Sequence, residues 1–143
     1  MMRVERSALV PYSAQAMYDL VADVDSYPEF LPGCRAVKVH ERDAEHVKAS
    51  IEMAKGPVHK WFTTINHLTP PERMDLSLVE GPFRHLQGCW HFKSLGEKGS
   101  KVSMEMEFVF ASRFLEKTIG PVFNDMVNRL VDAFVERARK TYG

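Results

Sequence analysis

The chain contains 143 residues, and its 19 Lys and Arg residues balance its 19 Asp and Glu residues. A chain of this length buries roughly two-thirds of the surface that it exposes when unfolded, so it needs no disulfide framework or structural metal. A hydrophobic content of 45% excludes a disordered chain. A net charge of zero argues against a protein that mainly wraps a phosphate backbone, and we expect no DNA partner. The sequence predicts a single domain over residues 1–143.

The two cysteines and the first residues of the chain indicate the cellular compartment of the protein. Cys34 and Cys89 lie far apart and belong to no C-x-x-C motif, so we expect free thiols in a reducing environment. Charged residues occupy the positions where a signal peptide has its apolar run, and no apolar stretch is long enough to span a bilayer. These features predict a cytoplasmic location, with peripheral contact at the inner membrane as a further expectation.

The first thirty residues predict one strand and two short helices. Residues 2–10 alternate between apolar and polar side chains, which is typical of a strand. Ser13 is placed to cap a short helix that runs through Val21. Ser26 and Glu29 have the spacing of a capping box, which predicts a second, very short helical turn that begins there.

The middle of the chain, residues 35–110, has a period of two and predicts antiparallel strands. Apolar and polar residues alternate in short runs that are separated by turns rich in Gly and Pro. The last run, residues 102–110, has the cleanest alternation in the chain. We expect roughly seven strands, counting the first.

After Ser112 the period changes to that of an amphipathic helix. Apolar residues recur at intervals of three and four as far as Ala138, with charged residues between them. Gly120 and Pro121 interrupt this pattern, and the helix must kink or restart there because a proline has no amide hydrogen. The expected fold class is therefore α+β, with a helix-grip architecture in which a curved antiparallel sheet wraps a long C-terminal helix.

Three segments carry a resemblance to a known family: residues 23–34, 60–64 and 80–92. They resemble the START-like family that includes the coenzyme Q-binding proteins and the bacterial ribosome-association toxins, within the polyketide cyclase-like helix-grip superfamily. The resemblance extends over essentially the whole chain. It implies a non-catalytic protein that binds ubiquinone or a related isoprenoid lipid between the sheet and the C-terminal helix and supports respiration, with no other cofactor. The bacterial relatives imply an alternative, in which the protein binds the large ribosomal subunit and blocks subunit association.

A lipid carrier of this fold needs a cavity, of a few hundred Å³ if it is a typical small-molecule pocket. The alternative is an interior filled by Met, Phe and Val side chains. The residues that we expect to line the cavity are Lys60, Phe62, Thr64, Asn66, Leu76, Leu78, Leu86, Gly88, Trp90, Phe92, Met104, Met106, Phe108, Val122, Phe123, Met126, Val127 and Leu130.

Lys60 and Asn66 are the two residues of this set that would donate a hydrogen bond to a quinone carbonyl. The alternative for Lys60 is a place near the sheet edge, from which its ammonium reaches water. Gly88 has no side chain, so it leaves room for a ligand ring or for the kinked helix.

Two apolar segments are candidates for a mouth or lid of the cavity, with transient membrane contact as one role and closure of the core as the other. Their residues are Tyr27, Pro28, Phe30, Leu31, Pro32, Phe114, Leu115 and Ile119. Contact with ribosomal RNA would instead depend on exposed cations. The candidates for that contact are Lys38, Arg84, Arg113, Lys117 and Arg137.

Other chemistry has little support in the sequence. His85, Cys89 and His91 share one strand face, but we expect that face to be exposed to solvent, and no carboxylate cluster with ligand spacing joins them. No Ser/His/Asp arrangement and no Gly-rich phosphate loop occurs. We therefore expect neither a metal site nor an enzyme.

Overall fold

The computed structural model describes residues 1–143 and contains one seven-stranded antiparallel sheet. The order of the strands in the sheet is β1-β7-β6-β5-β4-β3-β2, so the first and the last strand along the chain are neighbours and the others follow as a meander. The strands are β1 (Met2–Val10), β2 (Cys34–Arg42), β3 (His46–Lys55), β4 (Val58–Thr69), β5 (Arg73–Glu80), β6 (Phe83–Ser94) and β7 (Ser100–Phe110).

Two short helical segments connect β1 to β2. Helix α1 (Ala14–Ala22) begins where predicted, because the Ser13 hydroxyl accepts a hydrogen bond from the Ala16 amide at 3.0 Å. The 3₁₀ helix η1 (Val24–Glu29) begins three residues earlier than a cap at Ser26 indicates. The predicted cap at Ser26 is wrong, since its hydroxyl donates to the Asp23 carboxylate at 2.6 Å and Ser26 lies within the helix.

The C-terminal helical region consists of two helices. Helix α2 (Arg113–Thr118) is capped by Ser112, and helix α3 (Gly120–Tyr142) starts directly after Ile119. Of the two alternatives at Pro121, the helix restarts: Pro121 occupies the first turn of α3, where its missing amide hydrogen costs no hydrogen bond.

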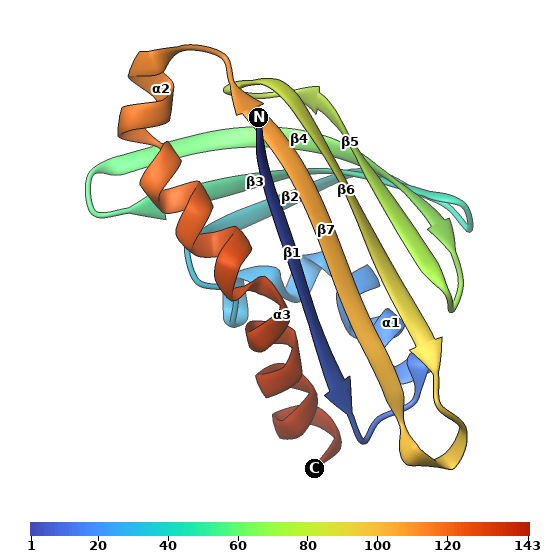
Figure 1. Ribbon diagram of the computed structural model, residues 1–143. Helices are drawn as coiled ribbons and strands as arrows, with labels where there is room; N and C mark the ends of the chain where they lie inside the picture. The colour runs from blue at the N-terminus through green and yellow to red at the C-terminus, as the bar shows by residue number, and fades with distance from the viewer.

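Helix α3 lies diagonally across the curved sheet, while α1 and η1 close the remaining part of its concave face (Figure 1). The buried stripe of α3 meets the inward-facing positions of the strands, and aromatic rings meet edge to face between them. Phe123 of α3 lies 4.8 Å from Phe108 of β7 between ring centroids, and Phe134 lies 5.3 Å from Trp90 of β6. This arrangement confirms the predicted α+β helix-grip fold.

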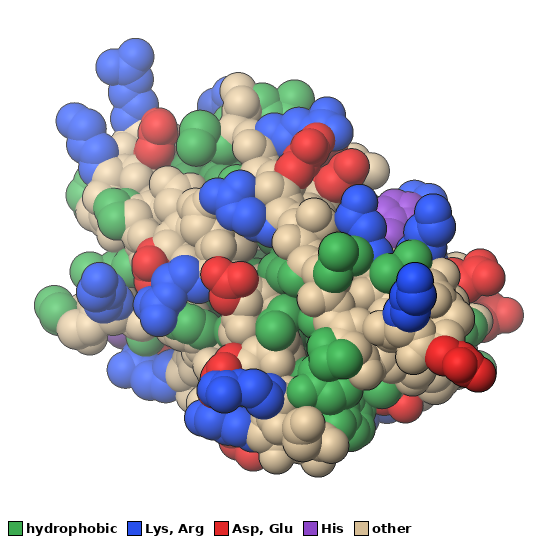
Figure 2. Space-filling view, turned by 60° about the horizontal axis from the view of Figure 1, so that its bottom comes forward, with side chains coloured by type: hydrophobic (Ala, Val, Ile, Leu, Met, Phe, Trp, Pro, Cys, Tyr) green, Lys and Arg blue, Asp and Glu red, His purple; other side chains and the backbone are tan.

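No helix of the protein combines the length and the apolar character needed to cross a bilayer. The charged side chains lie on the surface with both signs intermixed, as the view from below shows (Figure 2).

Candidate functional site

An apolar cavity lies between the sheet and α3, and its volume is about 60 Å³. Fifteen of its 18 lining residues are hydrophobic. The lining residues are Val24, Tyr27, Leu31, Ala49, Ile51, Phe62, Thr64, Asn66, Met74, Leu76, Leu86, Gly88, Trp90, Met106, Phe123, Met126, Val127 and Leu130. The cavity is much smaller than the few hundred Å³ expected from a typical pocket of this fold, so the interior is close to the filled core that was the alternative.

One polar pair lies in the wall of this cavity. The Thr64 hydroxyl donates to the Asn66 side-chain carbonyl oxygen at 3.1 Å, and both residues are buried on β4. The amide nitrogen of Asn66 has no partner among the side-chain hydrogen bonds of the structure, although only 5% of the residue is exposed. Asn66 therefore offers an amide donor in the apolar wall, where a carbonyl acceptor would gain a hydrogen bond.

The segment η1 and the loop after it cover one end of the cavity. Tyr27 is buried, its hydroxyl donates to the Val21 carbonyl, and burial raises the pKa of that hydroxyl well above its usual value. From α3, Arg137 holds this cover from outside: its guanidinium lies 3.1 Å from the Glu29 carboxylate and 4.9 Å from the centroid of the Phe30 ring. The cover is therefore held by one buried hydrogen bond and by ion pairs from Arg137 to Glu29 and from Arg42 to Asp25.

Gly88 leaves room for a neighbouring side chain and for no ligand ring. A Cβ atom at Gly88 would lie 3.2 Å from the Met106 Cε atom and 3.2 Å from the Glu105 carbonyl oxygen, because β7 is paired with β6 at this point. Met106 thus fills the space beside the glycine. The predicted room exists, but the protein itself occupies most of it.

Twelve of the 18 residues predicted from the sequence lie in the cavity wall. That any of them contacts a ligand stays a prediction. Four of the remaining six are buried in the core beyond the cavity, and Leu78 is half-buried. The residues predicted to line the cavity that lie outside its wall are Lys60, Leu78, Phe92, Met104, Phe108 and Val122.

Lys60 is the most consequential of these corrections. It follows the alternation of β4 with Phe62 and Thr64, but its side chain is exposed and absent from the cavity wall. The reason is its position along the strand: Lys60 is the third residue of β4, directly after the turn from β3, and therefore lies near the end of the strand. Its place near the sheet end matches the alternative considered above.

The predicted mouth residues divide into two groups. Tyr27 and Leu31 are buried in the cavity wall, and Phe30 packs half-buried against Phe134 at 5.2 Å between ring centroids. Pro28 is exposed and Pro32 is half-buried. At the other segment, Phe114 is exposed, Leu115 is half-buried and Ile119 is buried in the core.

Four lining residues were missing from the predicted set: Val24, Ala49, Ile51 and Met74. Three of them, Ala49, Ile51 and Met74, belong to apolar and polar runs of period two and lie on the apolar face of their strands. The signal for these three was therefore present in the alternation.

The outer face of the sheet carries the cluster of histidine and cysteine residues. The Cys89 thiol lies 3.2 Å from His91 Nε2, and His85 lies 3.3 Å from the Glu107 carboxylate. Burial, and to a lesser degree the nearby Asp75 carboxylate, raises the pKa of Cys89 to about 12. No three His, Cys, Asp or Glu side chains are arranged to hold a metal ion, and both cysteines are free.

The fold and the cavity define a helix-grip protein, and comparisons with known proteins give its family. Residues 10–135 match the family described as polyketide cyclase / dehydrase and lipid transport, and the chain belongs to this family. Over 143 residues it is 46% identical to the ribosome association toxin RatA of Vibrio cholerae, covering 100% of this chain and 99% of that one.

Two more distant likenesses complete the comparison. The chain is 29% identical to the mitochondrial coenzyme Q-binding protein COQ10 of Drosophila melanogaster, covering 96% of this chain and 59% of that one. The crystal structure of the Zhui aromatase/cyclase from a Streptomyces species superimposes with a TM-score of 0.86 at 16% identity, covering 99% of this chain and 96% of that one. The latter likeness concerns the fold alone.

Proposed function

We propose that this protein associates with the ribosome by binding the large subunit, and that it thereby prevents the joining of the two subunits. The proposal involves no catalysis and requires no cofactor. It places the protein in the cytoplasm, where the ribosomes of a bacterial cell are found.

The observation that carries the proposal is the small volume of the cavity. An engineered apolar cavity of about 150 Å³ holds a benzene molecule, whereas the cavity between the sheet and α3 measures about 60 Å³. A quinone ring with its substituents is larger than benzene. A cavity smaller than a quinone ring supports a function that the protein carries out on its surface.

The comparison with named relatives supports the same direction. The likeness to the ribosome association toxin covers both chains almost completely, while the likeness to the coenzyme Q-binding protein is weaker and covers about three-fifths of that protein. The absence of acidic, basic or histidine side chains from the cavity wall supports a role without acid-base catalysis.

The proposal is tested by sedimentation with purified subunits. The protein is mixed with large or small ribosomal subunits and centrifuged through a sucrose cushion at several salt concentrations. We expect it to pellet with the large subunit and to be released as the salt concentration rises, because charged contacts to RNA release counterions. A protein that stays in the supernatant with both subunits at physiological salt would overturn the proposal.

Binding of ubiquinone or a related isoprenoid lipid is the second candidate function, and one observation favours it. Asn66 presents a buried amide donor in an apolar wall, which is the group that a quinone carbonyl would accept from. Loading would require α3 to move away from the sheet. Phe123 and Met126 of α3 are buried in the wall of the same cavity as Asn66, and the present cavity is smaller than a quinone ring.

The second candidate has its own test. Protein purified without detergent is extracted with organic solvent, and the extract is analysed by mass spectrometry. A stoichiometric quinone or other isoprenoid in the extract would favour the carrier function. Its absence, together with no uptake of a short-chain ubiquinone, would remove that function.

A further inference from the structure

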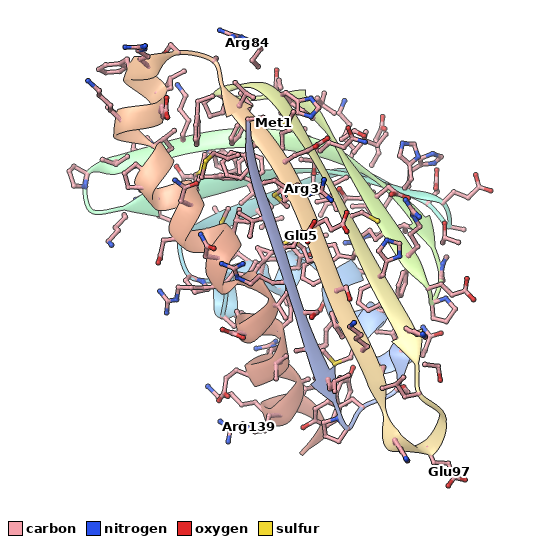
Figure 3. The ribbon with its side chains drawn as sticks, viewed as in Figure 1. Met1, Arg3, Glu5, Arg84, Glu97 and Arg139 are labelled. Atoms are coloured by element: carbon pink, nitrogen blue, oxygen red, sulfur yellow. The ribbon has the colours of Figure 1, made fainter.

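The end of the molecule that carries α2 combines unpaired cations with an exposed aromatic ring. We call the four residues Arg84, Arg113, Phe114 and Lys117 the α2-end surface. Arg84 comes from the start of β6, and the other three come from α2. Figure 3 shows Arg84 beside the start of β1 at this end of the molecule, with Glu97 of the β6–β7 turn at the opposite end.

Two of these residues line a groove of about 340 Å³, and Phe114 and Lys117 each follow a residue of its lining along α2. Arg84 and Arg113 both line it, although 29 positions separate them in the sequence, because the start of β6 is paired with the end of β7, from which α2 follows. Glu116 is the one carboxylate among the residues that line the groove. The groove thus has a net positive charge.

None of the three cations has a carboxylate partner. Arg84, Arg113 and Lys117 are exposed and take part in no ion pair, whereas Arg35 is held by Glu52 and Arg139 by Glu136. Each of these guanidinium and ammonium groups keeps its donors available. Arginine in particular presents two parallel donors that match a phosphate group.

Phe114 is held outward by the residues around it. Ser112 caps α2 through a 3.1 Å hydrogen bond from the Leu115 amide, and Ile119 anchors the other end of the helix in the core. Consequently 73% of Phe114 remains exposed, more than any other aromatic residue of the chain. An exposed ring beside cations that flank a groove is the combination that binds unpaired nucleotides, with the base stacked on the ring and the backbone in the groove.

We infer that the α2-end surface binds an unpaired, single-stranded segment of large-subunit RNA, with phosphates at Arg84, Arg113 and Lys117 and a base stacked on Phe114. This inference rests on the proposed association with the ribosome and names the part of the molecule that makes the contact. A flat anionic membrane is the other surface that would attract cations, but α2 has only six residues, so Phe114 with Met1 and Met2 of the groove is the apolar area that this end could insert, and no long amphipathic helix face lies there.

A matched control lies at the opposite end of the molecule. Lys93, Lys98 and Lys101 on and near the β6–β7 turn are exposed and take part in no ion pair, so this end carries the same number of free cations. No aromatic ring is exposed beside them in the turn; its exposed apolar residue is Leu95. Replacing these lysines changes the total charge equally and leaves the α2-end surface intact.

The experiment compares three variants with the wild type in sedimentation with large subunits and in anisotropy with a labelled single-stranded RNA oligonucleotide. The variants are Arg84→Gln/Arg113→Gln/Lys117→Gln, Phe114→Ala, and the control Lys93→Gln/Lys98→Gln/Lys101→Gln. Thermal melting verifies that each is folded, which we expect because all the replaced side chains are exposed.

We expect the first variant to bind RNA about tenfold or more weakly. A plot of its log association constant against log salt concentration should be less steep by about 2, since three phosphate contacts are removed. Loss of base stacking in Phe114→Ala should weaken binding about five- to hundredfold. The control should bind within about twofold of the wild type.

The outcomes separate the inference from the proposed function. A wild type that pellets with large subunits while the first two variants bind equally well would overturn the inference and leave the ribosomal function in place. A wild type that fails to pellet but binds the oligonucleotide through Arg84 and Phe114 would overturn the ribosomal function and the large subunit as the source of the RNA, and would leave single-stranded RNA binding by this surface in place. Equal losses in the first variant and the control would show general charge attraction and overturn the inference. The same variants are also sedimented with anionic lipid vesicles, and losses seen only with the vesicles would assign the surface to a membrane and overturn the inference as well.

Discussion

The guanidinium of Arg137 lies over the ring of Phe30, 4.9 Å from its centroid, while also pairing with Glu29 at 3.1 Å. These two contacts join the last turns of α3 to the segment that covers the cavity. The side chain of Arg137 is 27% exposed, so solvent screens it only in part. The cover is consequently held shut by a residue far from it in the sequence.

We predict that Arg137→Met loosens this cover. Removing the cation from Phe30 and Glu29 should cost about 1 kcal/mol and lower Tm by about 2–4 °C. The Leu31 amide, which donates to the Tyr27 carbonyl at 2.9 Å, should exchange its hydrogen faster. The control is Arg129→Met, which removes the exposed ion pair with Asp125 within α3. It should change neither Tm nor the exchange rate of the Leu31 amide. Unchanged exchange at Leu31 in Arg137→Met would mean that the buried core alone holds the cover.

The second prediction concerns the contact between Gly88 and Met106. Leucine at Gly88 should meet Met106 and the β7 backbone, and the overpacked core should lose about 1–3 kcal/mol of stability in urea unfolding. In a Met106→Ala background the same change should cost at least about 1 kcal/mol less, because the space is then free. Strictly additive effects would show that the new side chain does not enter the space that Met106 occupies.

Stability at low pH should depend on Glu52. Arg35 donates two hydrogen bonds to this carboxylate at 2.9 and 3.2 Å and so holds its pKa below the usual 4.5. A carboxyl whose pKa is lower in the folded chain stabilises the fold above 4.5, and this contribution is lost as the pH falls through the lower, folded value. The free energy of unfolding should therefore fall below pH 4.5, and less steeply in Glu52→Gln and in Arg35→Met. If the free energy of unfolding fell equally steeply below pH 4.5 in all three proteins, the pair between Glu52 and Arg35 would not be the source of the pH dependence.

The two thiols should react slowly while the protein is folded. The pKa of Cys34 is raised to about 11 and that of Cys89 to about 12, chiefly by burial, so few thiolates exist at neutral pH. We expect a disulfide reagent to modify both thiols about a hundredfold more slowly, or slower still, than in urea. Asp75→Asn should speed up the modification of the Cys89 thiol and leave the modification rate of Cys34 unchanged. Rapid modification of folded Cys89 would show that its thiol is activated.

Alternation and capping residues were sufficient to predict most of the fold. The strict period of two identifies β7 because one of its faces is buried against α3 and the other is solvated. Pro121 marks the restart of the last helix because its missing amide hydrogen is tolerated only in the first turn. Ser26 failed as a signal because a side-chain hydroxyl can bond to a neighbouring carboxylate as readily as to the backbone.

The candidate site was less predictable, because the period of a strand gives the face of a side chain but not its depth. Lys60 and Phe62 share a face, yet the side chain of Lys60 near the start of β4 is exposed, while Phe62 lies in the cavity wall. Volume is harder still to infer, since it depends on how side chains from distant elements, such as Met106 and Phe123, meet above the sheet. A fold that commonly encloses a ligand is here almost filled.

The most direct test of the central claim is subunit joining measured by light scattering with protein freed of all lipid. The account holds that a protein with a closed core acts through its surface, so the lipid-free protein, added to large subunits before small ones, should reduce the yield of joined ribosomes in proportion to its concentration. An undiminished yield at saturating protein, or inhibition that appears only after a quinone is added back, would contradict it.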